Sequence, residues 1–268
     1  MRKKTYVEVG GTVMEYAAMG RGSRKVVMLP GLSDGLATVG GKTWILSLVY
    51  KKYLKDYTVY IFSRKQDMPE GYSIRDMAED QVLAMDALGI DCADVLGVSQ
   101  GGMIAQWMAA DHPEKVRKLV LAMTAPNVTQ EAKEAVGTWM EMAQRGDHAA
   151  LMMDTAERMY TEKYMRKNRS FFPMLAKFTK PRDYDRFMKN AEAILAFDGR
   201  EACRRIACPT LILAGSEDRT VGNGAANELR DRIPNSELFV YEGLGHGAFQ
   251  EAQDFYDRVF AFFGKEPA

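Results

Sequence analysis

Histidine and cysteine are scarce in this sequence, which has three residues of each among 268. Three cysteines cannot all pair within one chain, and none of them has metal-ligand spacing or an adjacent histidine. A disulfide-based or metal-based framework is therefore not indicated. A reduced environment is the simpler interpretation, and we expect a cytoplasmic protein without a bound metal.

The sequence also has no formal net charge, because 36 basic residues balance 36 acidic ones. A nucleic-acid-binding protein would usually be basic. No apolar run approaches the roughly 20 residues of a membrane-spanning helix. The first residues show no apolar signal-peptide core, and phosphate-loop and dinucleotide-binding patterns are lacking. We therefore expect no membrane, nucleic-acid or cofactor partner, and a monomer or homodimer that binds a small-molecule substrate.

Short apolar runs are present, and they alternate with helical patterns. Lys25 to Leu29 and Ala93 to Val98 are typical of strands buried on both faces. The segment 74–88 repeats apolar residues at helical spacing. This alternation predicts an α/β fold with a mostly parallel, eight-stranded sheet flanked by helices. The expected strands are 6–9, 12–17, 25–29, 57–62, 93–98, 118–123, 210–214 and 237–241.

The pattern changes after the sixth expected strand, where a long stretch shows helices and no convincing strand. Thr129 and Asp147 can cap two of these helices, and Asp183 can start a third. The stretch begins at the sheet edge where open α/β folds bind ligands, so we expect it to act as a lid. The predicted division is a core (1–126 and 206–268) with a helical lid (127–205) inserted in it.

The sequence around Ser99 matches G-x-S-x-G, the nucleophile elbow. In this turn the serine sits between a strand and a helix, and a Cβ on either glycine would clash, which explains Gly97 and Gly101. The turn exposes the Ser99 hydroxyl, and the helix start presents the Gln100 amide to an oxyanion. A glycine-rich turn without catalysis is the alternative. The expected strand before Ser99 and helix after it favour a nucleophile.

A serine nucleophile needs a base, and three histidines are available. His112 lies at a helix end and His148 at the start of a lid helix, so we expect both at the surface. His246 lies in a glycine-rich loop directly after the strand 237–241. The glycines leave its imidazole free to reach a cleft, and His246 is the predicted base.

An acid must orient that base, and the loop after the strand 210–214 offers two, Glu217 and Asp218. The loop after the strand 118–123 has no carboxylate. A second oxyanion donor is expected in the loop after the strand 25–29. Its position there points to the Leu32 amide.

With these motifs the chain resembles the α/β-hydrolase superfamily, in particular its small, lid-bearing serine hydrolases. The strongest marks are GVSQGG at 97–102, GSEDRTV at 215–221 and GLGHGAFQE at 243–251. The resemblance implies that the acid is Asp218, through the family pattern G-x-x-D-x-x-V, and that Glu251 completes the histidine motif. The chain order Ser, Asp, His is also that of this superfamily.

The sequence departs from the family pattern at two places beside the expected pocket. Pro30 stands where many members have histidine, and residues 63–67 replace most of the pattern D-x-R-G-x-G. These changes leave the predicted triad of Ser99, Asp218 and His246 intact, but they affect which substrate the pocket would accept. The serine at the elbow argues against haloalkane dehalogenases and epoxide hydrolases, which use aspartate there.

The resemblance and the triad imply hydrolysis of a small, largely apolar carboxylic ester through an acyl-enzyme. The lid is rich in methionine and aromatic residues, which predicts an apolar pocket. Carbon–carbon bond hydrolases, lactonases, thioesterases, small peptidases and cofactor-free perhydrolases share this fold and triad, and a slow-turnover ligand receptor is a further alternative. The candidate pocket residues are Trp139, Met140, Phe171, Phe187 and Phe249.

Overall fold

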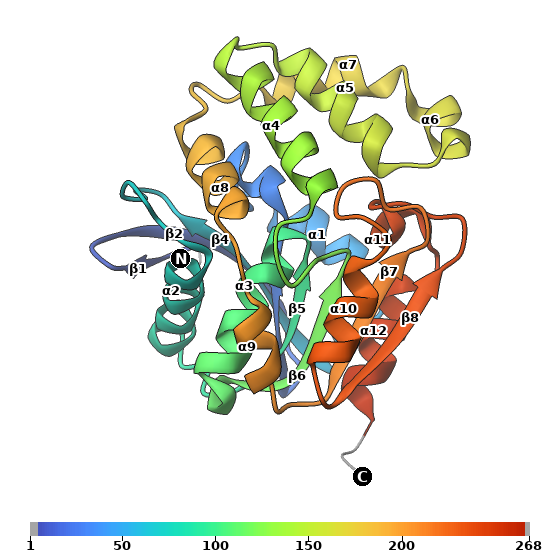
Figure 1. Ribbon diagram of the computed structural model, residues 1–268. Helices are drawn as coiled ribbons and strands as arrows, with labels where there is room; N and C mark the ends of the chain where they lie inside the picture. Colours follow the sequence, from blue (N-terminus) through green and yellow to red (C-terminus); the bar gives the residue numbers. More distant parts are fainter. Residues whose placement is uncertain (1–4, 266–268) are drawn as a thin grey trace.

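The computed structural model describes residues 5–265, and its strands form one sheet in the order β1-β2-β4-β3-β5-β6-β7-β8 (Figure 1). β2 pairs antiparallel with β1 and β4, and the other neighbouring strands are parallel. The mostly parallel, eight-stranded sheet is thus confirmed. The strands are β1 (Tyr6–Val9), β2 (Thr12–Gly20), β3 (Arg24–Leu29), β4 (Tyr57–Lys65), β5 (Ala93–Val98), β6 (Val116–Ala122), β7 (Thr210–Gly215) and β8 (Ser236–Tyr241).

The sheet begins with a tight hairpin between β1 and β2. Gly10 and Gly11 turn it with φ angles of +57° and +80°, a conformation that favours glycine and suits a two-residue hairpin turn. At the centre of the sheet, every residue of β5 except Val98 is buried. This burial fits a strand covered on both faces.

Helices cover both faces of the sheet (Figure 1). The helix α12 shows why they pack there, because Phe255, Val259 and Phe263 recur on one stripe and are fully buried. One face carries α2 (Ile74–Ala87), α3 (Gln100–Asp111) and α10 (Ala225–Arg232), and the other carries α1 (Thr43–Val49) and α12 (Phe255–Gly264). Shorter elements are η1 (Leu32–Gly35), η2 (Pro113–Lys115), α9 (Arg200–Arg205) and α11 (Ala248–Glu251).

Six helices lie between β6 and β7, and the first five of them lie above the carboxyl ends of the parallel strands (Figure 1). Thr129 and Asp147 cap the first two through their side chains, as predicted. The third expected helix begins two residues later than predicted, and Asp183 accepts a hydrogen bond from the amide of its first residue. The five helices are α4 (Gln130–Gln144), α5 (His148–Met159), α6 (Glu162–Asn168), α7 (Phe171–Thr179) and α8 (Asp185–Leu195).

We refer to α4–α8 as the lid helices. Within them α5 packs on α4 and α7, and α8 packs on η1 of the core. Pro173 lies in the first turn of α7, where its missing N–H breaks no intrahelical bond. The division of the chain at residues 126 and 205 stays a prediction.

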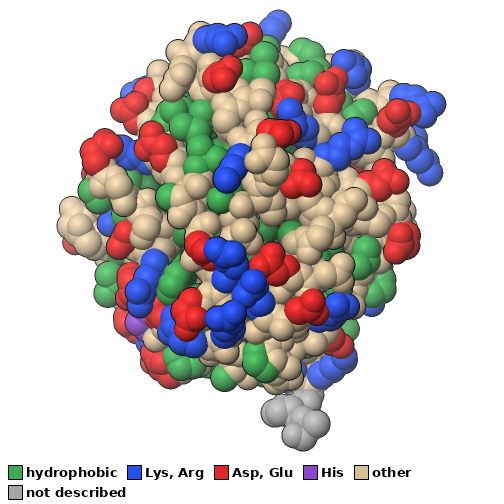
Figure 2. Space-filling model, in the orientation of Figure 1, with side chains coloured by type: hydrophobic (Ala, Val, Ile, Leu, Met, Phe, Trp, Pro, Cys, Tyr) green, Lys and Arg blue, Asp and Glu red, His purple; other side chains and the backbone are tan. Residues whose placement is uncertain are grey.

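The surface of the molecule carries charges of both signs. Figure 2 shows basic and acidic side chains interspersed over the visible face, in keeping with the balanced composition. Among residues 5–265, no helix is both long enough and apolar enough to cross a membrane. The three cysteines are free thiols.

Candidate active site

The predicted nucleophile Ser99 sits at the junction of β5 and α3 in a strained conformation, with φ 54° and ψ −120°. A Cβ on Gly97 would lie 2.6 Å from the Gly102 Cα, and one on Gly101 would overlap the Leu29 carbonyl. Both glycines are therefore required by close backbone approach. The Thr124 hydroxyl donates to the Ser99 carbonyl at 2.8 Å and holds the turn from the end of β6.

The predicted acid and base are in direct contact. Asp218 Oδ2 lies 2.8 Å from His246 Nδ1, and both side chains are almost fully buried. Asp218 Oδ1 accepts two further hydrogen bonds, from the amides of Thr220 (2.8 Å) and Val221 (3.0 Å). Burial alone would raise the pKa of the Asp218 carboxyl, but these partners outweigh it and the pKa is lowered. An ionised Asp218 holds the proton on Nδ1 and leaves Nε2 as the acceptor.

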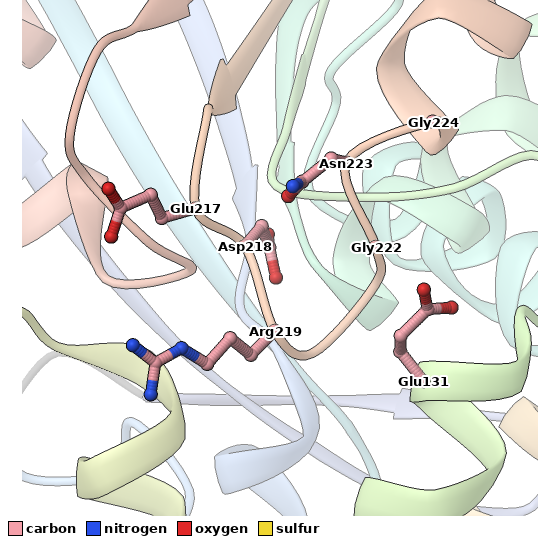
Figure 3. A pocket seen from close by; sticks show the side chains of 7 residues that line it. All are labelled: Glu131, Glu217, Asp218, Arg219, Gly222, Asn223 and Gly224. Atoms are coloured by element: carbon pink, nitrogen blue, oxygen red, sulfur yellow. The ribbon is translucent and has the colours of Figure 1, made fainter.

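The neighbouring acid Glu217 takes no part in this pair. Figure 3 shows its carboxylate directed away from Asp218, on the rim of a cleft of about 530 Å³ that is lined by charged residues, an asparagine and glycines. Glu131, at the start of α4, lies on the opposite side of that cleft. Among the described residues, no group of three or more His, Cys, Asp or Glu side chains is placed to share a metal ion.

The loop after β3 lies against the nucleophile. A Cβ on Gly31 would be 3.3 Å from the Ser99 Cβ. Leu32 and Gln100 are the first residues of η1 and α3, so helical bonding does not engage their amides. The structure thus places two helix starts with unengaged amides beside Ser99, and their role as oxyanion donors stays a prediction.

Ser99 and His246 share no hydrogen bond, but residues next to Ser99 line one cavity and the residue after His246 bonds a residue that lines it. Gly31, Leu32 and Val98 line it beside Ser99. On the other side Met159 lines it, and the Met159 carbonyl accepts a 2.7 Å hydrogen bond from the amide of Gly247, the residue after His246. Catalytic hydrogen bonds are often long in ligand-free enzymes and tighten with substrate.

The cavity between the lid and the core has a volume of about 800 Å³ and a mainly apolar lining. Trp139, Phe187 and Phe249 line it, as expected from the sequence. Met140 and Phe171 are not among its lining residues. Met140 is rotated about 100° around α4 from Trp139 and packs against the core, and Phe171 is 49% exposed.

Other lining residues escaped the sequence analysis. Phe172 takes the place expected for Phe171, and α1 contributes two apolar side chains. Helix α5 contributes a stripe whose i, i+3, i+4, i+7 spacing could have revealed it. These additional residues are Leu46, Val49, Met152, Thr155, Ala156, Met159, Phe172 and Leu175.

The remaining histidines lie outside the site. His112 is partly exposed and contacts Glu79 at 2.9 Å, in agreement with the expected solvated helix end. The expectation of a surface position for His148 is wrong. It is 3% exposed, and its Nε2 lies 3.2 Å from the Thr179 hydroxyl at the end of α7, because α7 covers the start of α5.

The model of the α/β-hydrolase fold family matches residues 26–253. The chain therefore belongs to this family, and it is an enzyme, a hydrolase.

Relatives of known name cover most of the chain. A protein of Caulobacter vibrioides (strain NA1000 / CB15N) named "Putative carbamate hydrolase RutD" is 25% identical and covers 92% of this chain and 93% of its own. The 3-oxoadipate enol-lactonase 2 of Acinetobacter baylyi is 23% identical, with coverages of 92% and 91%. The crystal structure of MGS-M2, an α/β-hydrolase from a deep-sea metagenome library of the Medee basin, superposes with a TM-score of 0.86 at 22% identity and covers 98% of both chains. This structural likeness shows the fold.

Proposed function

We propose that this hydrolase cleaves small, largely apolar carboxylic esters with Ser99 as nucleophile, His246 as base and Asp218 as the orienting acid. The observation that carries the proposal is the buried Asp218–His246 pair, which leaves Nε2 as the proton acceptor, together with the cavity that the neighbours of Ser99 line. A structural role alone would not explain the strained backbone of Ser99.

The acylation step follows from this arrangement. His246 Nε2 takes the proton of the Ser99 hydroxyl as its oxygen attacks the ester carbonyl. The amides of Leu32 and Gln100 donate to the oxyanion of the tetrahedral intermediate. The charged imidazole is stabilised by Asp218 and then protonates the leaving alkoxide.

Deacylation repeats these roles with water. His246 removes a proton from the water that attacks the acyl-enzyme, and the second tetrahedral intermediate uses the same two amides. Collapse of this intermediate breaks the bond to Ser99 Oγ, which recovers its proton from His246. The carboxylic acid leaves through the cavity.

The lining of the cavity supports an apolar substrate. Residues of both the lid and the core present carbon surface there, with Trp139 and Phe187 on the lid side and Phe249 on the core side. A volume of about 800 Å³ lies within the range of small-molecule sites. A lactone is a cyclic ester and fits the same mechanism, and one relative of this chain is named as an enol-lactonase.

The experiment that tests the proposal is hydrolysis of a p-nitrophenyl ester series, from acetate to decanoate. The wild type should turn over these esters, and Ser99→Ala should lose about 10⁴-fold or more of kcat. Ser236→Ala, at the start of β8, is the matched control and should keep wild-type turnover. An inert wild type, or an active Ser99→Ala variant, would refute ester hydrolysis by this serine. A tightly held ligand with a single slow turnover would instead favour a receptor.

A further inference from the structure

A cluster of buried polar side chains adjoins the loop that is expected to supply the Leu32 amide. Arg64, near the end of β4, is 1% exposed, and Asp34 of η1 is 2% exposed. Gln100 and Asn190 are fully buried, and Arg186 reaches the cluster from α8. Burying charges of this kind costs desolvation free energy, which points to a role of the cluster in the site.

A single atom of Arg64 connects the two segments of the expected oxyanion hole. Its Nη2 donates to the Pro30 carbonyl at 2.7 Å and to the Gln100 side-chain oxygen at 2.8 Å. Pro30 lies two residues before Leu32, and Gln100 itself carries the other expected donor. One guanidinium nitrogen therefore sets the separation between the two helix starts beside Ser99.

The lid is tied to the same cluster. Arg186 donates to the Asp34 carboxylate at 3.0 Å, to the Asp34 carbonyl at 2.7 Å and to the Arg64 carbonyl at 3.1 Å. The Gln100 side-chain amide donates to the Asn190 carbonyl of α8 at 3.0 Å. Both parts of the expected oxyanion hole thus contact the same lid helix.

The cluster also carries excess positive charge. Among residues 5–265, Asp34 is the only carboxylate within 4 Å of either guanidinium, so two cations face one anion. Burial lowers the pKa of Arg64 to about 10, which leaves its guanidinium protonated at neutral pH. A fixed positive charge next to the site favours the negative charge that develops on the substrate oxygen.

We propose that Arg64 is a positioning residue for catalysis. Through the Pro30 carbonyl and the Gln100 side chain it fixes the two amides that bind the oxyanion, and Arg186 links the lid to this support. The inference rests on the proposed function, because it assigns a role within the same site. Since the amides meet the oxyanion only in the transition state, loss of the support lowers kcat and leaves KM nearly unchanged.

The test uses Gln100→Leu, Arg64→Met and the double variant, with Gln106→Leu as the matched control. Gln106 is also a fully buried glutamine of α3, but its side chain bonds the Ala125 carbonyl instead of Arg64. Two readouts are the kcat and KM for the best ester and the rate at which an alkyl fluorophosphonate labels Ser99. Thermal unfolding identifies the variants that fold.

The proposal predicts that Gln100→Leu lowers kcat and the labelling rate about 10-fold to 100-fold, with KM within threefold of wild type, since direct loss of one oxyanion donor has a larger effect. Gln106→Leu should keep both rates within twofold. The double variant should be little slower than the slower single variant, because both changes remove the same bridge.

Three outcomes overturn the proposal. They are a folded Gln100→Leu with rates within twofold of wild type, an equal loss in Gln106→Leu, or a change in KM alone. If Arg64→Met does not fold, the comparison of Gln100→Leu with Gln106→Leu still tests whether the contact between Arg64 and Gln100 supports catalysis. A wild type that neither turns over esters nor becomes labelled at Ser99 refutes the proposed function, and this inference with it.

Discussion

The contact between Asp218 and His246 allows the effect of one substitution, Asp218→Asn, to be worked out atom by atom. The carboxylate accepts from His246 Nδ1 on one oxygen and from the amides of Thr220 and Val221 on the other. An asparagine has one acceptor oxygen and one NH₂ donor. If its oxygen keeps the two backbone amides, its NH₂ faces His246 Nδ1, which must then be the acceptor.

That orientation places the imidazole proton on Nε2, where it cannot receive the Ser99 proton. The reverse orientation turns the NH₂ group toward two N–H donors and loses both hydrogen bonds, each of which contributes about 1 kcal/mol or more. The first orientation is therefore favoured. We expect kcat to fall about 10⁴-fold, which corresponds to about 5 kcal/mol of transition-state stabilisation.

The assay compares Asp218→Asn with Glu217→Gln on the best ester of the series. Glu217 is the adjacent carboxylate and points away from the pair, so its variant should keep wild-type activity (Figure 3). Thermal unfolding should show both variants folded at the assay temperature. Retention of a tenth or more of kcat in folded Asp218→Asn, or a large loss in Glu217→Gln, would show that the acid has been misassigned.

Two further predictions concern stability. Gly101→Ala should destabilise the protein by about 3 kcal/mol or more, or prevent folding, because the added Cβ would overlap the Leu29 carbonyl. Gly137→Ala, which has open space around it in α4, should raise the free energy of unfolding by about 0.5–1 kcal/mol, and denaturant unfolding measures both changes. Burial, with a contribution from Lys180, lowers the pKa of His148 in the folded state, so the stability it contributes is complete above the unfolded-state pKa near 6.5 and is lost as the pH falls from there through the lower folded-state pKa. The wild type should therefore lose more Tm between pH 8 and pH 5 than His148→Gln, and an equal loss in both would contradict this assignment.

The sheet could be predicted because its signals are local. Each parallel strand is a short apolar run, and the glycines at 97 and 101 mark a turn whose clashes follow from backbone geometry alone. The contact between Asp218 and His246 could be anticipated because both follow neighbouring strands, β7 and β8, at one edge of the sheet. In each case, a few adjacent residues contain the information.

The support of the expected oxyanion hole could not be predicted, because it depends on contacts between distant residues. The stretch 63–67 showed only a departure from the family pattern, yet Arg64 bonds residues 34 and 36 positions away. The same reason explains why the surface position expected for His148 is wrong, because the end of α7, which is distant in the sequence, covers this side chain. The segment 43–49, which forms α1, has apolar residues at consecutive positions and therefore lacks the separate apolar and polar faces that identify an amphipathic helix.

The bonds between the lid and the histidine segment limit how substrate can reach the cavity. The Met159 carbonyl holds the Gly247 amide, and the Thr161 amide and hydroxyl donate to Glu251 at 3.0 and 2.6 Å. A motion that lifts the junction of α5 and α6 would break these bonds and disturb the segment that carries His246. Arg186 restrains α8 at the other end of the lid.

Helices α1 and α7 both line the cavity and carry neither set of bonds, so an entrance between them would leave both anchors in place. These two helices carry most of the large exposed apolar side chains of the described residues: Trp44, Ile45, Leu48, Val49, Phe171, Met174 and Phe178. An entrance between these helices would therefore be apolar on its outer side. An apolar molecule would lose part of its hydration shell on this surface before it reached the cavity, whereas a charged molecule would gain no such favourable contact.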